Sequence, residues 1–202
     1  MDIQQILRDI KKELRTSMNG VASARMRESG INYKLNFGVE LPRLQQIATE
    51  FPSDHDLAQA LWKENARECK ILAGILQPEA TFYPEIADIW VETMPTAELA
   101  QLTTMHLFCR MPSAAQKAFE WMADEREMFL LCGLLLITRL LMQDIAMNER
   151  AENEFLDQAE CALNHSNLHI KRAAISAIQK FMNQSETNWN KGEIILSRSL
   201  NS

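Results

Sequence analysis

The sequence predicts an all-α protein, and three observations support this fold class. Leu, Ala, Glu, Gln, Met, Lys and Arg dominate the composition, and these residues lose little conformational freedom in helices. Only six Gly and six Pro occur in 202 residues, which argues against disorder and against an all-β fold with many turns. Apolar residues also recur three and four positions apart along almost the whole chain.

The N-terminal third contains three predicted helices. Ile6, Ile10 and Leu14 form one apolar stripe on a helix over residues 3–18. The sequence NGVAS ends this helix, and a short helix follows over residues 24–28. Pro42 then lies in the first turn of a helix that reaches Phe51, where its missing N–H is not needed.

Beyond residue 54 the pattern predicts pairs of helices separated by short breaks. Short connections make neighbouring helices antiparallel, and the second helix of each pair is the more apolar. Pairs that recur every ~30–45 residues are typical of a HEAT/armadillo-like α-solenoid, with an irregular helical bundle as the alternative. The predicted pairs cover residues 54–63 with 66–76, 79–92 with 96–109, 113–122 with 125–142, and 147–163 with 167–181.

We expect one HEAT-like domain over residues 1–182, followed by a tail or short helix over residues 183–202. The apolar run over residues 128–142 is too short for a membrane span and contains Arg139, so it indicates a buried helix. The N-terminus has the pattern of an amphipathic helix and not of a secretory signal. The cysteines lack paired spacing, so we expect buried free thiols in a protein of the reducing cytoplasm. They are Cys69, Cys109, Cys132 and Cys161.

The charge is distributed unevenly. The net charge is −6, which argues against a generic nucleic-acid binder. Residues 1–70 carry 11 Lys and Arg against 10 Asp and Glu, whereas residues 71–202 carry 10 against 17. The basic side chains are therefore relatively concentrated in the N-terminal third.

The sequence contains no motif for a metal, a cofactor or a catalytic nucleophile. His165 and His169 are four apart, but no cysteine or carboxylate lies at a suitable spacing beside them. A glycine-rich phosphate loop and a G-x-S-x-G motif are both missing from the sequence. We predict no metal and no cofactor, and we interpret Trp62, Trp90 and Trp121 as packing residues between helices.

A group of basic residues is the main candidate for a binding surface. Each one could be a solvated surface charge, but together on a curved solenoid they could follow a phosphate backbone. Arg67 and Lys70 are three positions apart and share a helix face. The candidate DNA-binding residues are Lys34, Arg43, Lys63, Arg67, Lys70, Lys171 and Arg172.

Two segments resemble a known family. NFGVELPRLQQIATEF (residues 36–51) and LAQALWKENARECKILAGIL (residues 57–76) resemble successive segments of AlkD-type DNA alkylation repair proteins, of the HEAT-like repeat DNA glycosylase superfamily. The resemblance covers about residues 24–182. It implies a HEAT-like solenoid whose basic concave face holds duplex DNA. It also implies a monofunctional glycosylase that releases alkylated purines, with an aspartate beside tryptophans stabilising the developing charge on the sugar.

The sequence departs from that family's catalytic pattern. TAELAQLTTMHLF (residues 96–108) lacks the expected tryptophan, and Gln101 stands about where the aspartate is expected. Near the start of the next inner helix, Leu131 and Cys132 follow Phe129 where a basic residue is expected. In the final inner helix, Ser176 stands about where an aromatic residue is expected. Whether the protein is an enzyme therefore stays open.

Glu98, one turn before Gln101, is the candidate catalytic carboxylate. A structural role is the alternative, because an acidic residue in the first turn of a helix interacts favourably with the helix dipole. Two functions remain open: an alkylation-repair protein that binds duplex DNA, with or without excision, and an inactive scaffold for DNA structures or a protein partner. The second is favoured by residues 79–160, which carry 15 Asp and Glu against 5 Lys and Arg.

Overall fold

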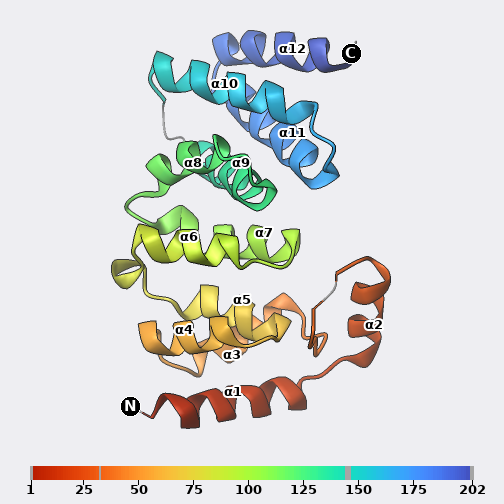
Figure 1. The fold of residues 1–202 in the computed structure, drawn as a ribbon, viewed down its shortest axis with the longest axis vertical. Coiled ribbons are helices and arrows are strands. Elements are labelled where there is room, and N and C mark those ends of the chain that lie inside the picture. Colours follow the sequence, from red (N-terminus) through yellow and green to blue (C-terminus); the bar gives the residue numbers. More distant parts are fainter. Residues whose placement is uncertain (1, 32, 144–146, 201–202) are drawn as a thin grey trace. The chain divides into compact units, whose positions relative to one another are not determined.

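The computed structural model describes residues 2–31, 33–143 and 147–200. Over these ranges the protein is built from α-helices and two short 3-10 helices, with one isolated parallel bridge between Leu35 and Ala66 (Figure 1). The predicted all-α class is therefore confirmed. Contacts divide the chain into two compact units, Met1–Met111 (unit 1) and Pro112–Ser202 (unit 2).

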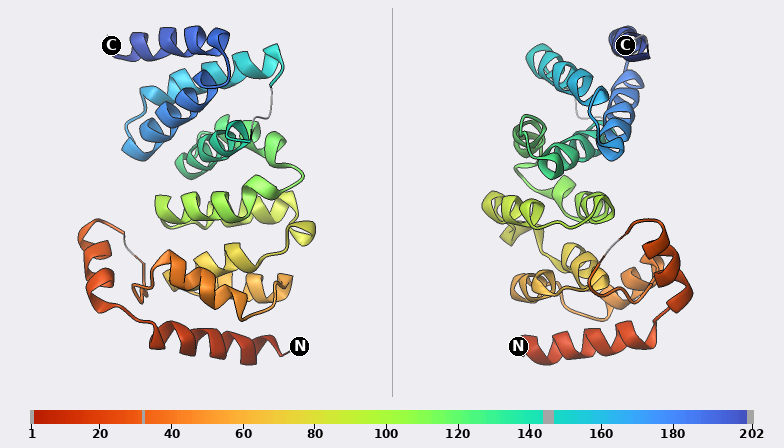
Figure 2. Two further views of the ribbon diagram at one scale, coloured as in Figure 1. Left: turned by 180° about the vertical axis from the view of Figure 1, so that it is seen from behind. Right: turned by 45° about the vertical axis from the view of Figure 1, so that its right-hand side comes forward.

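Unit 1 packs its helices around α5. This helix contacts α3, α4 and α7, and α1 contacts α4 (Figure 2). Eight of the ten residues of α5 are buried. Unit 1 contains α1 (Ile3–Thr16), α2 (Gly20–Glu28), α3 (Leu41–Thr49), α4 (His55–Lys63), α5 (Arg67–Leu76), η1 (Glu79–Thr81), α6 (Pro84–Glu92), α7 (Ala97–His106) and η2 (Phe108–Arg110).

Unit 2 has α9 and α11 at its centre. α9 packs against α8 and α11, and α11 packs against α10 and α12. A Cβ atom on Gly133 of α9 would lie 2.5 Å from the Met122 backbone nitrogen and 2.9 Å from the Ala118 carbonyl oxygen, so α8 and α9 touch through their backbones. The elements are α8 (Ala114–Met122), α9 (Glu127–Leu141), α10 (Glu149–Leu163), α11 (Leu168–Met182) and α12 (Glu186–Leu200).

The helix pairs agree closely with the sequence prediction. The second helices were expected to begin near residues 66, 96, 125 and 167, and they begin at Arg67, Ala97, Glu127 and Leu168. In the C-terminal region α12 occupies most of the segment predicted as a tail or short helix. The domain boundary at residue 182 stays a prediction.

The two helix starts that differ most from the prediction each have a local cause. The helix predicted to begin at residue 79 begins at Pro84, because proline disfavours the helical conformation of the residue before it and Tyr83 is extended (φ −78°, ψ 152°). The helix predicted to begin at residue 24 begins at Gly20. There the Asn19 side chain accepts a hydrogen bond from the Ala22 N–H and caps the helix four residues earlier.

The three tryptophans predicted to pack between helices, Trp62, Trp90 and Trp121, are buried. The rings of Trp62 and Trp90 stack at a centroid separation of 4.0 Å and an interplanar angle of 4°. Their indole nitrogens donate to the hydroxyl of Thr93 (3.0 Å) and the side-chain carbonyl of Gln59 (3.2 Å). Trp121 is buried in unit 2.

The cysteines are free thiols, but not all of them are buried. Burial raises the pKa of Cys69 to about 12, and it also raises the pKa of Cys132, so both are unreactive at neutral pH. The expectation of burial is wrong for Cys161, which lies on the exposed face of α10, and Cys109 is partly exposed. Across the described residues, none of the helices is long and apolar enough to cross a membrane.

Candidate nucleic-acid interface

The segment between α2 and α3 is held against the start of α5. The Leu35 N–H donates to the Asn65 carbonyl (3.1 Å), and the Arg67 N–H donates to the Leu35 carbonyl (2.9 Å). These two bonds form the parallel bridge between Leu35 and Ala66. The segment thereby lies beside the loop that joins α4 to α5.

On its other side the same segment packs against the start of α2. The Asn19 N–H donates to the Phe37 carbonyl (2.9 Å), and the Ser23 hydroxyl donates to the Asn36 carbonyl (2.9 Å). Gly38 has φ +72°, and a Cβ atom there would contact the Asn19 carbonyl oxygen and lie 2.6 Å from the Ser23 nitrogen. Only glycine allows this left-handed conformation and this close approach together.

Glu68, fully buried on α5, completes the support of the segment. Its carboxylate accepts hydrogen bonds from the backbone N–H groups of Phe37 (3.1 Å) and Val39 (3.2 Å). It also accepts from the Arg67 guanidinium at 3.1 Å. A buried carboxylate is stable only when it is paired in this way.

Arg67 links this segment to α7. Its guanidinium donates to the Val39 carbonyl (3.0 Å) and to the Glu98 carboxylate, with a shortest distance of 2.6 Å. Burial alone would lower the pKa of Arg67, but the hydrogen bonds and charges of Glu98 and Glu68 raise it overall. Arg67 is only 3% exposed, so its positive charge is balanced by carboxylates inside unit 1 and is not presented to solvent.

Glu98 is placed in the first turn of α7, with its carboxylate toward Arg67 and Tyr33. The Tyr33 hydroxyl donates to Glu98 at 3.3 Å and lies 2.6 Å from the Thr96 hydroxyl. Burial raises the pKa of the Tyr33 phenol above its usual value. Tyr33, Arg67, Glu68 and Glu98 therefore form one polar network, which joins the 33–39 segment to α5 and α7.

We expect Glu98→Gln to lower the free energy of unfolding by about 2 kcal/mol, because it removes a charged acceptor of the Arg67 guanidinium. Glu85→Gln is a matched control, since Glu85 occupies the same second position of α6 but is exposed. Urea unfolding of both variants gives the comparison. Equal losses of stability in the two variants would mean that Glu98 stabilises the protein only through its interaction with the helix dipole.

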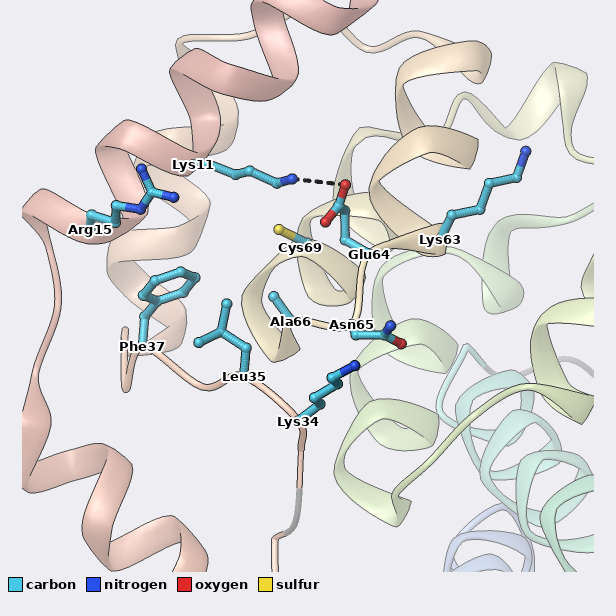
Figure 3. Close-up of a pocket in the computed structure, with 10 residues that line it drawn as sticks. All are labelled: Lys11, Arg15, Lys34, Leu35, Phe37, Lys63, Glu64, Asn65, Ala66 and Cys69. Atoms are coloured by element: carbon cyan, nitrogen blue, oxygen red, sulfur yellow. Dashed lines mark ion pairs between the residues drawn. The ribbon is translucent and has the colours of Figure 1, made fainter.

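A pocket of about 400 Å³ opens beside the supported segment. Four basic side chains and a single carboxylate line it, together with a small apolar wall. Lys11 of α1 reaches the Glu64 carboxylate at 2.8 Å, while Phe37 and Leu35 lie on the segment side (Figure 3). The lining residues are Lys11, Arg15, Lys34, Leu35, Phe37, Lys63, Glu64, Asn65, Ala66 and Cys69.

Two of the predicted DNA-binding residues, Lys34 and Lys63, are brought together at this pocket, and both are exposed. The sequence interpretation missed the other two cations, Lys11 and Arg15. Their spacing of four residues places them on one face of α1, beside the buried positions Ile10 and Leu14. That spacing was the signal that could have identified them.

The remaining unit 1 candidates lie outside the pocket lining. The Arg43 side chain turns toward α1, where it donates to the Ser17 hydroxyl (3.1 Å) and pairs with Glu13 (3.5 Å). The Lys70 ammonium donates to the Trp62 carbonyl (2.5 Å) and lies 4.8 Å from the centroid of the Trp62 ring. Burial lowers the pKa of this lysine. Their predicted contacts with DNA stay predictions.

Lys171 and Arg172 lie near the start of α11 in unit 2. The Arg172 side chain is exposed and the Lys171 side chain is partly exposed. Their predicted role as a second basic contact also stays a prediction. No group of three or more His, Cys, Asp or Glu side chains arranged to hold a metal ion occurs within residues 2–31, 33–143 and 147–200.

Comparison with known proteins places this geometry in context. The family model described as DNA alkylation repair enzyme matches residues 10–177. A similar solved structure comes from "a new family of proteins related to the HEAT-like repeat DNA glycosylases with affinity for branched DNA structures". It has a TM-score of 0.85 and 18% sequence identity, over 98% of this chain and 83% of that one, which confirms the predicted HEAT-like fold. No curated protein sequence matches the chain.

Proposed function

The chain belongs to the DNA alkylation repair enzyme family, and on this basis we propose that it binds duplex and branched DNA without releasing a base. The observation that carries the proposal is the gathering of Lys11, Arg15, Lys34 and Lys63 around one pocket of unit 1. Phosphate contacts by such side chains supply most of the affinity of DNA-binding proteins. The proposed site of action is the cytoplasm, where the thiols stay reduced.

The similar solved structure supports DNA as the ligand. Its description attributes affinity for branched DNA to its own protein family. The polar network under the 33–39 segment supports the same proposal, because it holds the backbone that carries Lys34 in one place. Arg67 and Glu68 are then positioning residues, and we replace the predicted DNA contact of Arg67 with this role.

The environment of Glu98 supports binding without catalysis. A carboxylate that stabilises a developing cationic sugar has to direct its charge at the DNA. The Glu98 carboxylate instead accepts hydrogen bonds from Arg67 and Tyr33, and its charge is balanced inside unit 1. We therefore propose that Glu98 supports the structure of the interface.

We expect the affinity of wild-type protein for duplex DNA to fall steeply with salt. The double variant Lys34→Ala/Lys63→Ala should show a lower affinity and a weaker salt dependence. Each lost phosphate contact should make the slope of log K against log salt shallower by about 0.9. Fluorescence anisotropy across a salt series measures both quantities. The matched control is Lys12→Ala/Arg27→Ala, which removes two exposed basic side chains of unit 1 that do not line the pocket.

Equal slopes for the two double variants would remove the pocket from the DNA interface. A lack of binding by wild-type protein at low salt would overturn the proposed function and leave a protein partner as the better account.

A base-release assay tests the second part of the proposal. DNA carrying 3-methyladenine and 7-methylguanine should lose these bases no faster with wild-type protein than in a protein-free control. Release that disappears in the Glu98→Gln variant would show that the protein is a glycosylase and that Glu98 faces the DNA.

A further inference from the structure

We propose that the pocket of unit 1 holds one unpaired nucleotide of a DNA strand, with its phosphate among the four cations and its base against the apolar wall. This inference rests on the proposed function and makes it more specific. It identifies unpaired nucleotides, such as those at flaps and branch points, as the feature that the protein selects. The argument uses the size, charge and lining of the pocket.

The size of the pocket suits a single nucleotide. Its volume of about 400 Å³ is near the lower end of the range for small-molecule sites, about 300–1,000 Å³. A nucleotide in a duplex is paired and stacked, so it would have to be extruded from the duplex before it could enter the pocket. A paired strand could contact the exposed Lys34 and Lys63 side chains, whereas an unpaired nucleotide could also reach the apolar wall.

The charge of the pocket suits a phosphate. The single carboxylate in the lining, Glu64, is already paired with Lys11, so Arg15, Lys34 and Lys63 give the site a positive excess. The N-terminus of α5 adds to this positive field, since Ala66 before the helix and Cys69 in its first turn line the pocket. Ala66 is the N-cap residue and has no side-chain oxygen to cap the helix.

The apolar wall favours a nucleotide over a bare phosphate as the ligand of the pocket. Leu35 is 47% exposed although it lies in a backbone segment that is bonded on both sides. Phe37 also lines the pocket and lies beside Leu35 in Figure 3, but it is only 6% exposed, so Leu35 presents most of the apolar surface. Phosphate alone makes no use of such a surface, whereas a nucleobase packs on apolar and aromatic side chains with little regard to sequence.

The polar network explains why this wall can be selective. Glu68 and Gly38 hold the backbone on both sides of Phe37, so the wall exists before a ligand binds. Preorganised sites bind with a smaller loss of conformational freedom. The pocket is therefore a preformed site.

The test compares three DNA probes: a plain duplex, the same duplex with a single-nucleotide flap, and the same flap with an abasic residue. The two flaps carry the same phosphates, so their difference reports the base alone. Since stacking of one base contributes ~1–3 kcal/mol, we expect the intact flap to bind on the order of tenfold more tightly than the abasic flap.

Two variants connect this preference to the pocket. Leu35→Ser removes the apolar wall but keeps all four cations, and it should abolish the preference for the intact flap while duplex affinity and its salt dependence remain. Val21→Ser is the matched control, because Val21 is an aliphatic residue of unit 1 that is 65% exposed and lies outside the pocket. Thermal unfolding confirms that both variants fold.

The outcomes separate the two proposals. Equal affinity of wild-type protein for all three probes, or a preference that survives Leu35→Ser, would overturn the nucleotide pocket and leave DNA binding intact. No binding of any probe at low salt would overturn both. If the intact and the abasic flap bind equally well and both bind more tightly than the duplex, the pocket holds phosphate only. This result would also overturn the inference.

Discussion

Replacing Glu68 with alanine is expected to lower the free energy of unfolding by about 3–5 kcal/mol, because it leaves two buried N–H donors unsatisfied, at ~1–3 kcal/mol each, and removes one of the two carboxylates that balance Arg67. The substitution removes the acceptor of the Phe37 and Val39 N–H groups and one partner of the Arg67 guanidinium. Glu68 is 0% exposed, so water cannot replace these bonds without opening unit 1. Chemical denaturation followed by circular dichroism measures the change.

Two further variants make this result specific. Glu68→Gln keeps the volume and one acceptor, so it should cost less than Glu68→Ala. Glu50→Ala removes an exposed carboxylate at the end of α3 and should change the stability by no more than about 0.5 kcal/mol. Even one unsatisfied buried donor costs ~1–3 kcal/mol. A loss below about 1 kcal/mol for Glu68→Ala would therefore show that other contacts hold the 33–39 segment.

Gly38→Ala is expected to cost more than about 2 kcal/mol, because a left-handed conformation with a Cβ atom alone costs ~1–2 kcal/mol. The added methyl group would also contact backbone atoms of Asn19 and Ser23, which cannot rotate away as the end of a side chain can. The start of α2 and the 33–39 segment would have to separate.

Gly30→Ala is the control for this substitution. Gly30 has φ +83°, but no atom lies within 4 Å of the position that a Cβ atom would take. It should therefore show the conformational cost without the steric one. The difference between the two urea unfolding midpoints measures the steric cost of a Cβ atom at residue 38. Equal midpoints would contradict the close packing of Gly38 against the start of α2.

The helix pairs could be predicted from the sequence because their signals are local. Apolar spacing of three and four residues locates each helix, and caps such as Asp54 and Thr96 lie at the breaks between them. The burial of Trp62, Trp90 and Trp121 follows from their size and their places late in the first helices of the pairs. Of the two misplaced helix starts, the one at residue 79 neglected the effect of Pro84 on the residue before it.

The polar network could not be predicted, because it depends on which face of α5 turns inward. Arg67 and Lys70 share a face of that helix, and charged residues on a helix are usually solvated. α5 is enclosed by α3, α4 and α7, so Arg67 and Glu68 are buried and Lys70 is half-buried. The partners of Arg67 come from Val39 and Glu98, about 30 positions away on either side, which no local pattern reports.

These sequence separations have a consequence for how unit 1 folds. Phe37 bonds Glu68, Gln59 bonds Trp90, Trp62 bonds Thr93 and Arg67 bonds Glu98, and each of the four pairs is 31 residues apart. Contacts that link one helix pair only to the next let structure spread stepwise from a nucleus, without a search for distant partners. The bond between Tyr33 and Thr96 spans 63 residues. Its loop-closure cost is larger than that of the other contacts, so we expect the Tyr33 contact to form after the intervening helix pairs are in place.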